Sequence, residues 1–396
     1  MNPNDNNTGI LSIVIPTRNR YECITSCLQA ARLAAPSAQI LIADSSDGDE
    51  LEDFINNLKE SPARLKYIRT SPHSNVVENF EAALTHCTGE YIIYIGDDDL
   101  VGPEIERVAE WALSQNIDAL VPYGNKFGVA YYWPGVKSKY FGNEYSGKVF
   151  VWSITSKFKL INPLREIRRA ERSVGRGLAL LPRIYHGMVR KKTLVEVETR
   201  FKSLFGGVSP DIYSAVLIAR VAQRVVYLDY PFFVPGASPR SEAGSGAAQT
   251  DRISFEESPY LKRFKNLKWD ALIPKFFSPY TVWGYSLVEG MKIGGFEISV
   301  ITYCRIYARC LIYCSSYRRE VFISMRTAKH QFGSTALGAA MILALAEEGW
   351  HFLSHLMPKL LRPRAGGWAK RYSGIENSVE AFQFVQKMAG KFTPSI

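Results

Sequence analysis

The sequence predicts an α/β protein in which a mixed, mainly parallel sheet is flanked by helices. Apolar runs and helical patterns alternate over residues 10–120, polar residues follow the apolar runs, and three consecutive aspartates end the fourth run. A chain of 396 residues, 46% hydrophobic and 22% charged, is long enough for two or three domains with cores of their own.

The predicted elements alternate in order. Strands are expected at residues 11–15, 39–43, 65–68 and 91–95, with helices at 21–34, 49–59 and 76–87, and a later strand at 183–189 rejoins the sheet. Sheets of this kind bind ligands at the carboxyl ends of their strands. The polar tips at residues 17–19, 44–47 and 97–99 are therefore expected to meet at one edge.

The aspartate triplet is the most informative motif. Gly96 permits a close approach to the end of a buried strand, and Asp97, Asp98 and Asp99 follow it. Three adjacent carboxylates repel one another unless a cation or several donors lie among them. A divalent metal carrying a phosphorylated ligand would satisfy them, since Mg²⁺ and Mn²⁺ prefer carboxylate and phosphate oxygens. A solvated acidic turn that caps the following helix is the alternative.

Changes in composition divide the chain into three parts. Residues 1–9 are expected to be disordered, residues 10–250 to form one domain with halves at 10–124 and 125–250, and residues 251–396 to form a helical C-terminal region. Residues 235–250 are rich in glycine, serine and alanine, so a mobile loop is expected there.

Charge and cysteine usage bear on location. Six cysteines without metal-ligand spacing, and a polar N-terminus without a secretory signal, predict a reducing cytoplasm. The longest apolar stretch, residues 335–346, is too short to span a bilayer. The net charge is +10, and tyrosines alternate with arginines over residues 303–319. This C-terminal part suits peripheral contact with an anionic membrane or a packed helical subdomain equally well, and no nucleic-acid partner is expected.

The polar tips, taken in order, resemble the family 2 glycosyltransferases of the GT-A fold, inverting enzymes that take sugars from nucleotide diphosphates. Residues 12–20, Asp44, residues 75–83 followed by 88–92, and the triplet as an Asp-x-Asp motif resemble family segments, and residues 180–245 do so more loosely. The resemblance implies transfer of a sugar to a glycan or lipid-linked acceptor, as in bacterial surface polysaccharide synthesis. It also implies Mn²⁺ or Mg²⁺ as cofactor.

The resemblance further implies roles for single residues. Asp211 would be the general base, although Ser209, Pro210 and Asp211 also describe an ordinary helix N-terminus. Asp97 and Asp99 would hold the metal. The donor nucleotide would contact Pro16, Thr17, Arg18, Asn19, Asp44, Asn75, Asn79, Asp97 and Asp98. Contacts to donor or acceptor are also expected from His186, Ser238, Arg240 and Ser241.

One departure from the family pattern, one open residue assignment and three alternative functions accompany this interpretation. His186 suits a core position as well, and no histidine follows it before His330, where some family members place a metal-binding histidine after the base. A nucleotidyltransferase would carry a glycine-rich, basic first loop, which residues 16–19 are not. A non-catalytic membrane-associated protein would be expected to lose the aspartates. A dehydrogenase is disfavoured, because no Gly-x-Gly-x-x-Gly follows the first strand.

Overall fold

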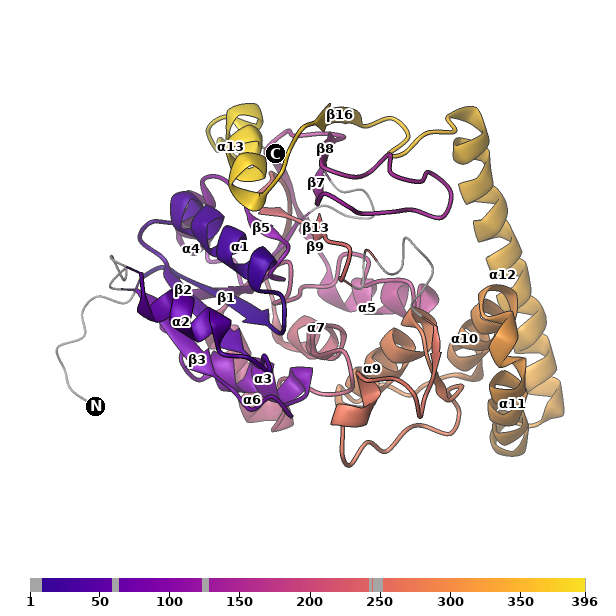
Figure 1. Cartoon of the computed structure of the whole chain (residues 1–396). Helices are drawn as coiled ribbons and strands as arrows, with labels where there is room; N and C mark the ends of the chain where they lie inside the picture. Colours follow the sequence, from indigo (N-terminus) through magenta and orange to yellow (C-terminus); the bar gives the residue numbers. More distant parts are fainter. Residues whose placement is uncertain (1–8, 59–63, 123–127, 242–243, 245–251, 396) are drawn as a thin grey trace.

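The computed structural model describes residues 9–58, 64–122, 128–241, 244 and 252–395 (Figure 1). Nearly all of the predicted disordered N-terminus and much of the predicted loop at 235–250 lie outside these residues. The central strands are β1 (Leu11–Thr17), β2 (Gln39–Asp44), β3 (Leu65–Arg69), β4 (Tyr91–Tyr94), β6 (Ala119–Pro122), β9 (Lys157–Ile161), β10 (Met188–Arg190) and β11 (Val225–Asp229).

These strands form one eight-stranded sheet in the order β3-β2-β1-β4-β10-β6-β11-β9. β10 and β9 pair antiparallel with their neighbours, while the remaining pairs are parallel. The predicted mixed, mainly parallel sheet is therefore confirmed. Of the later strand expected at 183–189, only residues 188 and 189 belong to a strand, the antiparallel β10, which lies between β4 and β6 as expected of a segment that rejoins the sheet.

Helices cover both faces of this sheet, because successive side chains of a strand point to opposite faces. On β1, Ile13 and Ile15 share a core with one set of helices and Val14 shares a core with the other. The first set is α1 (Tyr21–Ala34), α4 (Ile105–Ser114) and α13 (Ser378–Ala389), with α2 (Glu50–Asn56) at its margin. The second set is α3 (Val76–Leu84), α6 (Lys191–Phe201) and α7 (Pro210–Val221) (Figure 1).

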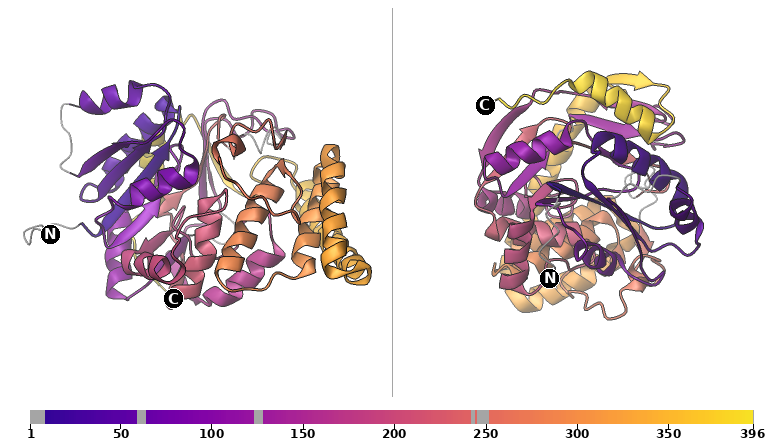
Figure 2. Two further views of the ribbon diagram at one scale, coloured as in Figure 1. Left: turned by 90° about the horizontal axis from the view of Figure 1, so that it is seen from below. Right: turned by 90° about the vertical axis from the view of Figure 1, so that its left-hand side faces the viewer.

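A second, four-stranded sheet brings the end of the chain back to the N-terminal half. Its order is β13 (Gly236–Ala237), β7 (Val129–Tyr132), β8 (Lys148–Val151) and β16 (Lys370–Ser373). α13 then packs against α1 (Figures 1 and 2). Two short pairs complete the strands: β5 (Leu100–Val101) with β12 (Phe233–Val234), and β14 (Ile253–Ser254) with β15 (Phe276–Phe277).

The remaining helices form a second core beside the sheet. They are α5 (Pro163–Arg172), α9 (Pro279–Ile293), α10 (Val300–Tyr313), α11 (Arg318–Phe332) and α12 (Ser334–Leu361), with 3₁₀ turns at Leu261–Arg263 and Ser315–Tyr317. α7 joins the two cores, since Val216 packs with these helices and Leu217 packs under the sheet. Within the described residues, no helix combines the length and apolar character needed to cross a bilayer.

The alternating tyrosines and arginines of α10 are core residues. Tyr303, Arg305, Tyr307 and Arg309 are all buried, at 8% exposure or less. These four side chains therefore cannot contact a membrane, which was one of the two possibilities that the sequence pattern allowed. Within α10, the pattern belongs to a packed helical subdomain.

Candidate functional site

A cleft of about 770 Å³ opens where the carboxyl ends of β1 and β4 face the helical part of the chain. Ten of the predicted site residues line it: Pro16, Thr17, Arg18, Asn79, Asp97, Asp98, Asp99, His186, Asp211 and Ser241. The predicted residues Asn19, Asp44, Asn75, Ser238 and Arg240 are not among its lining residues. The structure thus brings predicted residues from six separate segments of the sequence, between Pro16 and Ser241, together in one cavity.

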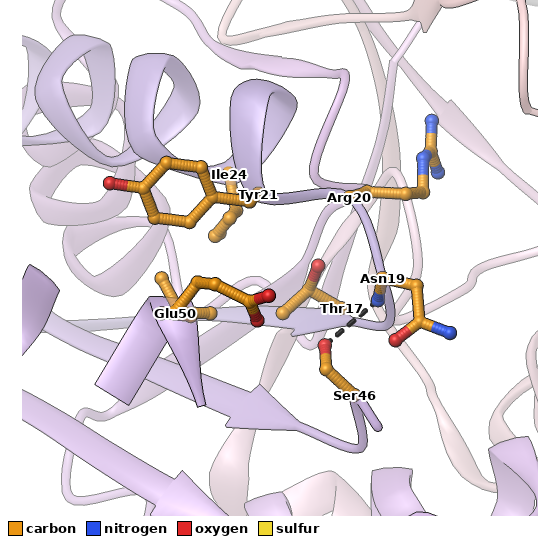
Figure 3. Close-up of a pocket in the computed structure, with 8 residues that line it drawn as sticks. Thr17, Asn19, Arg20, Tyr21, Ile24, Ser46 and Glu50 are labelled. Atoms are coloured by element: carbon orange, nitrogen blue, oxygen red, sulfur yellow. Dashed lines mark hydrogen bonds between the residues drawn. The ribbon is translucent and has the colours of Figure 1, made fainter. Parts of the chain in front are cut away.

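A much smaller pocket, of about 30 Å³, lies beside the cleft and shares Thr17 and Arg20 with it (Figure 3). Figure 3 shows the Arg20 side chain pointing away from Tyr21 and Glu50. This pocket has room for about one water molecule, so the larger cleft is the candidate substrate site.

Arg20 is the cation among the aspartates, and the sequence interpretation did not assign it to the site. Its Nη1 lies 2.6 Å from Asp97 Oδ1, and its Nη2 lies 2.8 Å from Asp98 Oδ2. Nη2 also donates to Ser238 Oγ at 2.6 Å. Burial disfavours the guanidinium charge, but Asp97 and Asp98 outweigh burial and raise the pKa of Arg20. An internal arginine thus supplies charge compensation that the sequence alone ascribed to a metal or to donors.

Asp97 is almost completely buried. Burial raises its pKa to about 7, although Arg20 and the Thr17 hydroxyl, which donates to Asp97 Oδ2 at 2.6 Å, act in the opposite direction. The Thr17 contact joins the tip of β1 to the residues that follow β4. Together with the pairing of Thr17 and Asp44 in the sheet, it confirms that the three polar tips meet at one edge.

Asp99 is held by donors on every side. Its Oδ2 accepts from Gly96 N at 2.7 Å and lies 2.7 Å from His186 Nε2, while its Oδ1 accepts from Gly236 N at 2.7 Å. His186 has a left-handed backbone (φ 66°), and its ring stacks on Phe233 with centroids 4.3 Å apart. With 28% of its side chain exposed and the cleft beside it, His186 is not a core residue.

The predicted metal ligands do not present a ready site in this arrangement. Asp97 Oδ2 and both oxygens of Asp99 already lie against hydrogen-bonding groups, namely Thr17, two backbone N–H groups and His186. Asp97 Oδ1 forms the ion pair with Arg20, although it has no hydrogen-bond partner among the described residues. Across the described parts of the chain, no three Asp, Glu, His or Cys side chains are grouped so that they could hold a metal. A divalent ion at Asp97 and Asp99 would therefore have to displace Arg20 or His186.

Asp211 enters the cleft from the first turn of α7. Ser209 is the residue before the helix and Pro210 its first residue, as expected of a helix N-terminus, but the Ser209 side chain makes no capping hydrogen bond. Burial raises the pKa of Asp211, while His186, nearby backbone N–H groups and Arg183 lower it. The carboxyl group thus lies close to the histidine that contacts Asp99, and its raised pKa suits a proton acceptor.

Three residues predicted to contact the nucleotide form hydrogen bonds that stabilise the strands and helices around the cleft. Asp44 is fully buried and accepts from Tyr67 Oη at 2.9 Å and Arg69 Nη1 at 3.1 Å. Asn75 caps α3 in a capping box with Glu78. Asn79 accepts from Thr70 Oγ1 and donates to Ala43 O, so it links α3 to the end of β2. Asn79 also lines the cleft.

The turn after β1 is fixed by the tip of β2. Arg18 pairs with Asp47 at 2.9 Å, and Asn19 exchanges hydrogen bonds with Ser46 and Asp47. Asn19 adopts a left-handed backbone (φ 52°), which asparagine tolerates better than most residues. Arg18 reaches the cleft from this turn, whereas Asn19 supports it.

The described start of the predicted mobile loop is packed in place. Ser238 N donates to Asp98 Oδ2 at 2.8 Å, and Ser241 Oγ donates to Ser238 O. At Gly236 a Cβ atom would lie 1.7 Å from Asp98 O, so only glycine fits against the triplet. Arg240 is exposed and does not line the cleft, whereas Ser241 does.

The opposite wall of the cleft is basic and aromatic, and it comes from residues that the sequence analysis did not single out. Arg183 and Arg263 line it, and within the described part of the chain neither forms an ion pair at salt-bridge distance. Burial lowers the pKa of Arg183 to about 10, and its buried Nε has no hydrogen-bond partner among the described residues. The aromatic members of this wall are Tyr260, Phe264, Phe277 and Trp283.

A family model identifies the N-terminal part of the chain. Residues 12–162, which include the aspartate triplet, match the model described as glycosyl transferase family 2. This part of the chain therefore forms a glycosyltransferase family 2 domain. No curated protein matches the sequence significantly.

Solved structures resemble the chain at low identity. Residues 1–349 of S. aureus TarS in complex with UDP-GlcNAc are 15% identical, with coverage of 86% of this chain and 91% of that one and a TM-score of 0.44. The mannosyltransferase PcManGT from Pyrobaculum calidifontis, in complex with GDP-Man and Mn²⁺, is 11% identical, with coverage of 86% and 87% and a TM-score of 0.38. Likeness at this level carries no inference about substrate or metal.

Proposed function

We propose that the protein is an inverting glycosyltransferase that moves a sugar from a nucleotide-diphosphate donor to a glycan or lipid-linked acceptor hydroxyl. The observation that carries the proposal is the meeting of Asp211 with the aspartate triplet in one cleft, although more than 100 residues separate them in the sequence. A role in bacterial surface polysaccharide synthesis, and a cytoplasmic location, stay predictions from the family resemblance.

The donor is proposed to lie along the tips of β1 and β4. Arg18 and Asn79 reach the cleft there, and the guanidinium groups of Arg183 and Arg263, which form no ion pair among the described residues, suit an anionic ligand. A nucleotide diphosphate carries such a charge, and more charge develops on it as the sugar leaves. Cations already in place stabilise that charge without reorganisation.

The acceptor is proposed to lie against the aromatic wall of the cleft. Apolar faces such as those of Tyr260, Phe277 and Trp283 can pack against sugar rings, while nearby polar groups fix their orientation. Asp211 would take the proton of the acceptor hydroxyl. The hydroxyl oxygen then bonds to the anomeric carbon, and the bond from that carbon to the diphosphate oxygen breaks, with its electron pair leaving on the diphosphate.

A divalent metal, Mn²⁺ or Mg²⁺, stays a prediction. When bound it would neutralise charge on the leaving diphosphate. The arrangement of Asp97 and Asp99 does not fit a metal without movement of Arg20 or His186, so no step above depends on one.

The test is a release assay with a panel of UDP, GDP, dTDP and CMP sugars. We expect one nucleotide to be released in an acceptor-dependent manner by the wild type and far more slowly by Asp211→Asn. Incorporation of a nucleotide monophosphate into the acceptor would instead support a nucleotidyltransferase.

A further inference from the structure

The outer face of α12 is a long apolar surface. The helix buries one stripe, made by Leu337, Ala340, Met341 and Ala344, in the core that it shares with α10. Most of the other side chains between Ser334 and Leu356 are exposed, among them Ile342 (73%), Leu343, Leu345, Trp350 (75%), Phe352 and Leu353. α12 forms an outer edge of the molecule in two views (Figures 1 and 2).

Between Ser334 and Leu356 this face carries few charged side chains. Between Ser334 and Leu356 the charged residues are Glu347 and Glu348, and both are tied to the interior. Glu347 pairs with Arg305 through two contacts of 2.7 and 2.9 Å, and Glu348 pairs with Arg309 at 3.3 Å and with Arg176. An exposed apolar surface of this length on a helix indicates a partner that covers it.

Cations border the apolar face at both ends. Residues 318–364 contain seven lysines and arginines but only three glutamates. On α11, which packs beside α12, the exposed side chains are Arg318, Arg319, Phe322, Ile323, Arg326, Lys329 and His330. At the other end, the Arg362 guanidinium lies 3.0 Å from the centroid of the exposed Trp368 ring.

We propose that these exposed side chains of α11, α12 and Trp368, here called the α11–α12 surface, bind an anionic lipid bilayer from one side. Tryptophan, phenylalanine and leucine side chains would enter the headgroup region, and the bordering arginines would contact lipid phosphates. Charge complementarity selects this partner, because a second copy of the chain would bring the same basic residues to the interface.

The surface is also linked to the cleft. Arg176 lines the cleft and contacts Glu348 on the inner side of α12. Docking would therefore hold the proposed acceptor wall near the bilayer, where a lipid-linked acceptor resides. This last link depends on the proposed function, whereas bilayer binding itself does not.

The experiment is co-sedimentation of the full chain with vesicles, without donor or acceptor. The vesicles contain either phosphatidylcholine alone or phosphatidylcholine mixed with phosphatidylglycerol. We expect binding to the anionic vesicles that weakens with salt. The double change Trp350→Ser and Leu353→Ser should reduce partitioning on the order of tenfold or more, because two apolar side chains no longer leave water. Arg318→Glu with Arg319→Glu should reduce it by a similar factor.

The matched control is Leu160→Ser, since Leu160 is 58% exposed on β9, far from α12 in the sequence. This control should bind vesicles like the wild type. Unfolding curves verify that each variant is folded. If the double change Trp350→Ser and Leu353→Ser does not fold, the single change Ile342→Ser on the same face takes its place.

Vesicle binding that is unaffected by both double changes, or the absence of binding at low salt, would overturn the proposal. A dimer that dissociates on Trp350→Ser and Leu353→Ser would overturn it in favour of self-association. Loss of vesicle binding with intact transfer to a water-soluble acceptor would separate this proposal from the proposed function.

Discussion

Arg20 and Asp97 form a largely buried ion pair, 2.6 Å long, at the point where the turn after β1 meets the residues that follow β4. Arg20 also reaches Asp98 and Ser238, so one side chain links three segments that surround the cleft. The pair explains how three consecutive carboxylates can lie at less than 6% exposure in one protein.

The first prediction concerns the stability that Arg20 provides. Arg20→Gln should lower the free energy of unfolding by about 3–5 kcal/mol, because it leaves Asp97 and Asp98 buried without their cation. Arg18→Gln is the matched control, since its carboxylate partner, Asp47, is 61% exposed and the loss should be small. Chemical denaturation of the three proteins measures the difference, and equal losses would show that Arg20 has no special role.

The second prediction concerns metal binding. In the absence of donor, Mn²⁺ should bind the wild type weakly, because Arg20 already occupies one oxygen of Asp97 and one of Asp98. Arg20→Gln frees Asp97 Oδ1 and removes the cation from Asp98 Oδ2, which still accepts from Ser238 N, so it should tighten Mn²⁺ binding on the order of tenfold or more. Calorimetric titration measures both affinities. Tight binding to the wild type that Arg20→Gln leaves unchanged would show that the arginine and the metal do not compete.

Four of the eight strands of the sheet, β1 to β4, could be predicted from the sequence. The runs that become β1 to β4 are apolar, β-branched and separated by helical patterns, so local residue preferences agree with the final fold. β16 and α13 could not be foreseen, because nothing near residue 370 indicates that it pairs with β8, more than 200 residues earlier.

The site could be predicted only in part. Residues at strand ends, such as Thr17 and Asp97, follow from the pattern, since the topology brings them together. Arg20 is only one residue past the predicted binding turn, and the need for a cation beside the triplet was a signal that could have identified it. Arg183 and Trp283 carry no comparable signal, because their place in the cleft depends on long-range packing.

The third prediction uses the raised pKa of Asp97. Its value of about 7 in the folded protein exceeds that of an unfolded aspartate, about 3.9, so the folded state binds the proton more tightly over this range. Asp97 therefore contributes a fall in stability as pH rises from about 4 to about 7. Thermal unfolding across this range should show a smaller fall in Asp97→Asn than in the wild type. Parallel curves would contradict the raised pKa.

The fourth prediction concerns the close packing of Gly236. Gly236→Ala should destabilise the protein and weaken donor binding, since its Cβ would lie 1.7 Å from Asp98 O and push β13 from the triplet. Gly338→Ala is the control: no atom lies within 4 Å of its Cβ position on α12, and alanine favours the helix by up to about 1 kcal/mol. Differential scanning fluorimetry with and without donor separates the two variants. Equal melting temperatures would contradict the packing argument.

The general base is the central claim, and one variant tests it most directly. For Asp211→Asn, turnover and donor affinity are measured on the same preparation. The account predicts a fall in turnover of roughly 10² to 10⁴, because the amide cannot accept the acceptor's proton. It also predicts nearly unchanged donor affinity, because Arg18, Asn79 and the triplet come from other elements. The wild-type rate should fall with decreasing pH as Asp211, whose pKa burial raises, takes up a proton. Near-wild-type turnover, with a small loss of thermal stability as the main effect, would contradict the account and leave Asp211 as an ordinary residue of a helix N-terminus.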